Sequence, residues 1–299
     1  MLGFATPKSG RGHGQGFGPG NSWRSAARRA SDPVLIAAAW FWRRPALAAL
    51  VLFATTPGAA EDFHSIRSRA ETRAREEWSA RRAASAQAGP SAPNAKDLAV
   101  QLGRACFELA EFASTAEARE ALAQEGIIAC RSITNGHSGT NHPAANYYLA
   151  LNLGQLARTK TLGALRLVEE MEMQFHLAIA GNPRLDQAGP DRCLGLLYSR
   201  APGWPASIGN RSKARKHLSK AVQIAPGFPE NHLFWMEALL KWKDDPALDA
   251  AMANYLILLP AARKEFAGEA WEWSWIDWED RLRSLQRRPR KREAASRKR

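Results

Sequence analysis

The chain has 299 residues, of which 45% are apolar and 24% are charged, proportions typical of a globular protein rather than a disordered one. Its net charge of +13 is concentrated near the ends: residues 1–60 carry +6 and residues 281–299 carry +9, whereas residues 96–280 carry −3. Because the central part is mildly acidic, the charge distribution argues against a specific nucleic-acid-binding protein.

Residues 1–60 have the features of a leader that directs secretion. Arg43 and Arg44 precede an apolar run over residues 45–56, and small residues follow up to Ala60. This order predicts a signal peptide that is cleaved after Ala60 and a mature protein in the periplasm. The alternative is an uncleaved membrane anchor. The two arginines and the short run argue against it, since a spanning helix needs about 20 apolar residues.

The rest of the chain divides by composition into three parts. Residues 61–95 are highly charged and predict a helical or linker segment, residues 96–286 predict the folded domain, and residues 287–299 predict a disordered basic tail. We expect at most weak contact of this tail with an anionic membrane surface. The chain has three cysteines without Cys-x-x-Cys spacing, which predicts small buried core residues rather than a disulfide framework.

Apolar residues in the domain recur at helical spacing, and no alternating strand pattern interrupts them. Breaks that contain Gly, Pro or Asp separate the helical stretches, which predicts an all-α domain of antiparallel helix pairs joined by short turns. The first apolar stripe consists of Leu98, Leu102, Ala105, Leu109 and Ala110, and the second of Ala118, Ala121, Leu122, Ile128 and Ala129. The breaks fall at residues 135–136, 181–183, 189–190, 226–227 and 244–246.

Two stretches carry the same pattern of residues at a separation of 43 positions, which is typical of a stacked repeat architecture. Each copy begins on one helix with a leucine, which is followed directly by a small or polar residue. Each copy ends with a proline after the next helix. The first copy consists of Leu151, Asn152, Gln155, Met171, Phe175, Ala178 and Pro183, and the second of Leu194, Gly195, Tyr198, Ala214, Leu218, Ala221 and Pro226.

This pattern resembles the tetratricopeptide repeat, most closely in the second copy. Small residues at Gly195, Ala214 and Ala221 allow two helices to approach closely, and Pro226 ends the second helix. The resemblance covers roughly residues 97–260, with weaker copies at its two ends. It implies a right-handed α-solenoid that presents a concave face to a partner protein.

Both clear copies have seven more residues than the usual repeat in the turn between their two helices. Equivalent insertions in a stacked array emerge on the same edge, so we expect one surface that offers Arg158, Lys160, Trp204 and Asn210 to a small ligand or peptide. The alternative is that the longer turns only pack on neighbouring helices, with Trp204 buried between two prolines.

No catalytic, metal-binding or cofactor-binding motif is recognisable in the sequence. His137 and His142 lie in a Gly- and Asn-rich loop and are a poor ligand pair without a third partner. Asp186, Asp191 and Arg192 predict helix capping or ion pairing. We therefore expect neither a metal nor a cofactor, and no enzyme. The rival interpretation is a helical-repeat enzyme whose site lies at the edge of the extended turns.

Apolar residues on the last helix form one continuous stripe, from which Trp273 is excluded. Such a stripe predicts a Trp-rich helix that caps the open end of the solenoid. A dimer interface and a membrane-surface helix are the alternatives. The stripe consists of Trp271, Trp275, Trp278, Leu282 and Leu285.

Together these patterns predict an exported, non-catalytic scaffold that binds another envelope protein. A narrower resemblance is to the T-component of TRAP transporters, an exported helical-repeat accessory. That resemblance implies a solute-binding protein as the partner.

Overall fold

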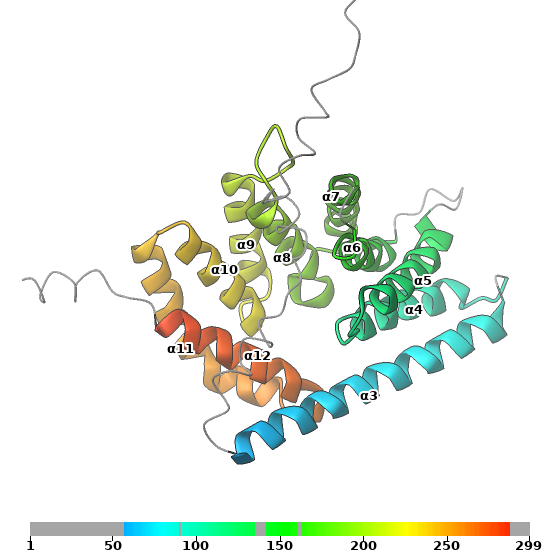
Figure 1. Ribbon diagram of the computed structural model, residues 1–299. Coiled ribbons are helices and arrows are strands. Elements are labelled where there is room, and N and C mark those ends of the chain that lie inside the picture. The colour runs from blue at the N-terminus through cyan, green and yellow to red at the C-terminus, as the bar shows by residue number, and fades with distance from the viewer. Residues whose placement is uncertain (1–56, 90, 135–141, 161–162, 288–299) are drawn as a thin grey trace, which may run out of the picture. The chain divides into compact units, whose positions relative to one another are not determined.

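The computed structural model describes residues 57–89, 91–134, 142–160 and 163–287, all of which belong to one compact unit (Figure 1). Over these residues the regular secondary structure consists of helices, and a single isolated bridge between Gly203 and Gly209 is the only β-type pairing. The predicted all-α class is therefore confirmed for the described chain. None of the described helices is long and apolar enough to span a membrane. Of the predicted signal peptide only residues 57–60 are described, as the start of a helix, and of the predicted basic tail only Arg287 is described.

Eight helices follow one another in four pairs, and the two helices of each pair contact each other. Within the third pair the contacts run in opposite directions along the two helices: Tyr198, near the end of the first helix, faces Lys213, whereas Asp191, nearer its start, faces Lys220. The two helices are therefore antiparallel. The pairs are α4 (Ala95–Ala110) with α5 (Ala116–Thr134), α6 (Pro143–Ala157) with α7 (Ala164–Gly181), α8 (Leu185–Arg200) with α9 (Arg211–Ile224), and α10 (Pro229–Lys241) with α11 (Asp245–Glu265).

A glycine on the first helix marks the closest approach in two of the pairs. A Cβ atom added to Gly195 would lie 2.7 Å from Leu218 Cγ, and one added to Gly103 would lie 2.4 Å from Cys130 Sγ. Since real side chains do not approach so closely, these pairs can pack at this distance only with glycine at these positions.

Asn152 takes the place of this glycine in the second pair. Its side chain is buried and donates hydrogen bonds to the carbonyl oxygens of Gly103 and Tyr148, both at 2.8 Å. Gly126 on α5 leaves room for the Asn152 amide, because an added Cβ would lie 2.5 Å from its Oδ1. The departure from a small residue thus serves to join α6 to the pair before it.

The apolar stripe predicted for α4 is confirmed, but the one predicted for α5 is wrong apart from Ala129, which is buried. Ile128 is exposed, whereas Ala123, Ile127 and Cys130 are buried. The buried face is rotated because α5 packs against α4 and also against α6, and the close approach of α6 is centred on Gly126.

Two further helices complete the described chain. The predicted charged segment is the helix α3 (Pro57–Ala88), and the last helix is α12 (Glu269–Gln286). Trp78 on α3 donates a hydrogen bond to Glu125 on α5, whereas Arg69, nearer the start of α3, pairs with Glu272 on α12 at 2.8 Å. Figure 1 shows α3, in blue to cyan, running from α12 to α4.

The aromatic residues of α12 divide between two environments. The predicted stripe packs with α10 and α11 into the second of the two main core clusters, in which Trp275 and Trp278 are buried and the rings lie 4.8 Å apart. Trp273, which falls off the stripe, contacts Phe63 of α3 and Phe112 of the α4–α5 turn. The sequence pattern therefore separated the two sets correctly.

Candidate functional site: a pocket between two turns

The two cations predicted to form a binding surface are engaged by acidic residues of the preceding helix pair. Arg158 is only 12% exposed and donates to Glu111 at 3.1 Å, and Lys160 pairs with Glu120. These contacts fasten the turn after α6 to the first helix pair. The Glu120 pKa is lowered, chiefly by its hydrogen bond from Lys160.

The other two predicted site residues lie in the connection between α8 and α9. Asn210 is the N-cap of α9, where its side chain accepts a hydrogen bond from the Lys213 amide at 2.9 Å. Trp204 is 89% exposed, so the interpretation that buries it between two prolines is wrong. The indole is therefore accessible, and its role in ligand binding stays a prediction.

A strained turn at the start of α8 is the most unusual local feature of the described backbone. Asp186, Gln187 and Ala188 have φ values of 48°, 55° and 63°, in the left-handed region. Residues with a side chain pay about 1–2 kcal/mol each for this conformation, so three in succession require strong external support. A functional explanation is sought where such strain is observed.

Arg192 supplies that support from inside the same helix. It is 5% exposed, and its Nη1 donates to the carbonyl oxygens of Asp186 and Gln187, each at 3.2 Å. Its Nη2 donates to Asp186 Oδ2 at 3.0 Å, and Tyr147 donates to the same oxygen at 2.5 Å. The guanidinium group thus satisfies the main-chain oxygens that the left-handed turn directs inward.

Burial opposes the positive charge on Arg192, but the nearby carboxylates outweigh this effect. Among these carboxylates the negative charge of Glu230 raises the pKa of Arg192 most, and that of Asp186 raises it further. The guanidinium group is therefore charged at all physiological pH values. Burial also raises the pKa of Tyr147, and the negative charge of Asp186 raises it further. Tyr147 therefore acts as a hydrogen-bond donor to the carboxylate.

Asn231 joins the left-handed turn to the turn between α9 and α10. Its side chain is 1% exposed, accepts from Arg192 Nη1 at 3.0 Å and donates to Gln187 O at 2.9 Å. The same amide also donates to Ala225 O at 3.3 Å, and the neighbouring His232 bonds to Pro226 O at 2.7 Å. One network therefore fixes both turns.

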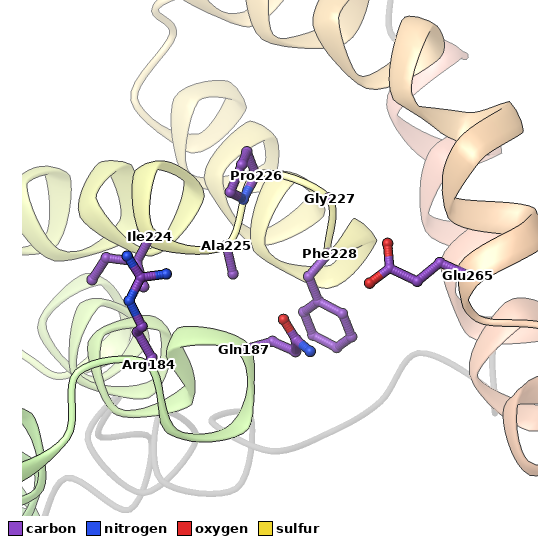
Figure 2. Close-up of a pocket in the computed structure, with 8 residues that line it drawn as sticks. All are labelled: Arg184, Gln187, Ile224, Ala225, Pro226, Gly227, Phe228 and Glu265. Carbon is purple, nitrogen blue, oxygen red and sulfur yellow. The ribbon is translucent and has the colours of Figure 1, made fainter.

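Between these turns lies a pocket of about 270 Å³, which we call the inter-turn pocket (Figure 2). Arg184 lies at one side and Glu265, at the end of α11, at the other, with the Gln187 amide and the Phe228 ring between them. The lining residues are Arg184, Gln187, Ile224, Ala225, Pro226, Gly227, Phe228 and Glu265.

The floor of the inter-turn pocket is a rigid aromatic group. Phe228 is buried and contacts the rings of Phe266, Trp271 and Trp278 edge-on, with centroid separations of 5.3–6.2 Å. The Arg192 guanidinium lies 5.2 Å from the Phe228 ring centre. A ring held on several sides is a fixed apolar surface for a ligand.

A second polar cluster lies where α7, α8 and α9 meet. Asp191 is fully buried and its Oδ1 lies 2.8 Å from His217 Nδ1, while Tyr198 donates to Glu172 and lies 3.2 Å from His176 Nε2. The pKa of His176 is lowered, first by burial and then by His217.

These contacts join three helices, and each carboxylate named has a partner on another helix. Asp191 contacts Lys220 as well as His217, and Glu172 contacts Lys213 as well as Tyr198. In the described part of the chain, no group of three His, Cys, Asp or Glu side chains is placed to hold a metal ion. The cluster is best explained as a polar contact between helices.

Sequence reasoning missed the inter-turn pocket, although it had noted Asp186 and Arg192 as a capping or pairing group. That pairing is confirmed, since the two side chains form an ion pair at 3.0 Å. The lining residues come from the start of α8, the α9–α10 turn and the end of α11, and they share no spacing that a pattern search could detect.

Comparison with known proteins provides no family assignment: no protein-family model and no curated protein matches the chain.

Proposed function

We propose that the protein is an exported, non-catalytic scaffold of the tetratricopeptide type that binds a partner protein of the cell envelope. In this proposal the four helix pairs stack as a right-handed solenoid, and α12 closes its last pair with the Trp-rich stripe. The observation that carries the proposal is the recurrence of one register of buried residues at the contact between the two helices of successive pairs.

The last pair extends this register beyond the two copies that are evident in the sequence. Met236 and Leu239 on α10 and Leu248 and Tyr255 on α11 are all buried. Their positions correspond to Gly195, Tyr198, Ala214 and Ala221 once the seven extra residues of the α8–α9 turn are removed. A short α10–α11 turn thus accompanies the usual repeat length, which supports the extra residues as insertions into a common unit.

Stacked pairs of this kind bind partners through the first helices of successive pairs, which line one side of the array. Arg104 on α4 and Lys241 on α10 carry exposed charges on first helices. Lys216 on α9 and Lys264 on α11 carry exposed charges on second helices and provide a matched control.

The test compares two charge-reversed variants of the full chain. We expect R104E/K241E to reduce recovery of the envelope partner at least fivefold in an affinity capture, whereas K216E/K264E leaves it within twofold. Circular dichroism checks that both variants remain folded. Equal recovery with the two variants would refute binding through the first helices, and capture of only cytoplasmic proteins would refute the envelope partner.

Export is tested separately by the N-terminus of the protein isolated from cells. A chain that begins at Glu61 supports cleavage after Ala60. A chain that retains residues 45–56 and sediments with membranes would favour the anchor.

A further inference from the structure

The inter-turn pocket carries charges of opposite sign on opposite sides. Arg184 and Glu265 both line it, and Figure 2 shows their charged groups separated by Gln187 and Phe228. A simple anion would be attracted by Arg184 but repelled by Glu265, and a metal cation would be attracted by Glu265 but repelled by Arg184. The charge pattern therefore favours a dipolar ligand with a carboxylate at one end and an ammonium group at the other.

The helix arrangement strengthens the preference for an ammonium group near Glu265. Helix α11 ends at Glu265. The C-terminal end of a helix carries a partial negative charge, which adds to the charge of the Glu265 carboxylate. A cationic end of the ligand is thus stabilised on this side of the pocket.

Between the two charges lie both apolar side chains and one amide. Ile224, Pro226 and the Phe228 ring line this part, and the Gln187 amide offers both a donor and an acceptor. An apolar side chain and one peptide group would match these elements. The volume of about 270 Å³ lies at the lower limit of about 300–1,000 Å³ for small-molecule sites, so the pocket has room for a few residues only.

The length of the ligand follows from the positions of the two charges. In a free amino acid the carboxylate and the ammonium group are attached to the same carbon, whereas Figure 2 shows Gln187 and Phe228 between the two charged groups of the pocket. Each added residue extends a peptide by about 3.3–3.6 Å. Two or three residues therefore place the termini one or two such steps apart.

The walls are held in place before any ligand binds. Arg192 and Asn231 fix the left-handed turn, and Asn231 with His232 fixes the turn at residues 225–226. Pre-organised walls reduce the entropy that binding must overcome. This accounts for the strain at residues 186–188, since that conformation is what places the Gln187 side chain at the pocket.

We propose that the inter-turn pocket binds a di- or tripeptide with free termini, with the peptide carboxylate on Arg184, its ammonium group on Glu265 and an apolar side chain on Phe228. The site is independent of the partner surface on the first helices.

The test is isothermal titration calorimetry of the full chain with alanyl-phenylalanine and with alanyl-phenylalanyl-alanine. Each peptide is also prepared with an acetylated N-terminus and with an amidated C-terminus. We expect the free peptides to bind, and either block to weaken binding at least fivefold. Free phenylalanine is the control for charge spacing, because both of its charged groups are attached to one carbon. Inorganic phosphate is the control for charge sign, because it carries negative charge only.

Three variants assign the contacts. R184Q should remove the effect of the C-terminal block, and E265Q should remove the effect of the N-terminal block. G227F should abolish binding by filling the pocket, because Gly227 does not have a positive φ and an added Cβ would meet only Glu265, at 3.5 Å. K264Q, which changes the residue next to Glu265 but not the pocket, is the matched control.

The proposal is overturned if neither free peptide binds, if blocked and free peptides bind equally, or if phosphate or phenylalanine binds as tightly as the peptides. It is also overturned if G227F retains binding while remaining folded by circular dichroism. These outcomes leave the scaffold proposal unaffected, since capture of the envelope partner is measured with variants at other residues.

Discussion

Replacing Arg192 by lysine tests whether this one side chain holds the left-handed turn. Its guanidinium group serves five acceptors: the main-chain oxygens of Asp186 and Gln187, the Asn231 Oδ1, the Asp186 carboxylate and, at 3.5 Å, the Glu230 carboxylate. A lysine ammonium has three donors, so at least two of these five contacts are lost, although Asp186 Oδ2 keeps its hydrogen bond from Tyr147 and Gln187 O keeps its hydrogen bond from Asn231. A lost hydrogen bond to a charged group costs about 1.5–3 kcal/mol, so the loss of two such contacts gives an expected decrease in the free energy of unfolding of about 3–6 kcal/mol for Arg192→Lys.

The measurement is urea unfolding followed by circular dichroism. We expect a lower midpoint with an unchanged dependence of the free energy on urea concentration. Arg166, an exposed arginine on α7, is the control, and Arg166→Lys should change the free energy of unfolding by less than about 0.5 kcal/mol. A loss of less than 1 kcal/mol for Arg192→Lys would refute the conclusion that Arg192 supports the turn.

A double variant separates support of the turn from general packing. Gln187→Gly removes the backbone strain at the centre of the turn and leaves the carbonyl group in place. If Arg192 acts through the turn, adding Gln187→Gly should recover part of the loss, so the two effects should be non-additive by about 0.5–1 kcal/mol. Strict additivity would indicate that Arg192 acts only through its buried ion pairs.

Three further predictions follow from the described contacts. Gln187→Gly alone should raise the free energy of unfolding by about 1 kcal/mol, because glycine adopts positive φ without strain. A lower melting temperature than that of the unchanged protein would contradict this. Gly195→Ala should lower it by about 1–3 kcal/mol by forcing α8 and α9 apart, and unchanged urea unfolding would contradict the close packing of Gly195 on Leu218. Burial lowers the pKa of His176 and of His232 below the ordinary value of 6.5, so the unfolded chain binds more protons and stability should fall as the pH decreases through about 6.5. Urea unfolding between pH 8 and 5 checks this. We expect the free energy of unfolding to change less with pH in His232→Gln.

The sequence predicted local features well because the helical period is visible along the chain. The residues of the α4 stripe and of the α12 tryptophan stripe are spaced so that they share one side of a helix, and the structure buries most of them. Prediction failed for α5, where two neighbours compete for the helix surface. There the glycine at position 126, rather than the larger residue at 128, decides which face is covered, since close approach depends on the smallest side chain.

The predicted binding residues show a different limit of sequence reasoning. Arg158 and Lys160 were expected at a ligand surface, but their charges are matched by Glu111 and Glu120, which precede them by 47 and 40 residues. Nothing in the spacing of these residues indicates that the helix pairs place them together. A charge on a surface turn can be assigned to a ligand or to a neighbour only when the neighbour is known.

The sequence by itself determined the helical class, the approximate positions of most helices and the repeated register of the central pairs, because each depends on residues within a few turns of one another. Only the tertiary structure decided where a pocket forms. The left-handed turn exists because Arg192 and Asn231 meet there, and the pocket exists because two turns and the end of α11 converge. Both depend on how one pair packs against the next, which is a property of contacts between distant residues rather than of any local pattern.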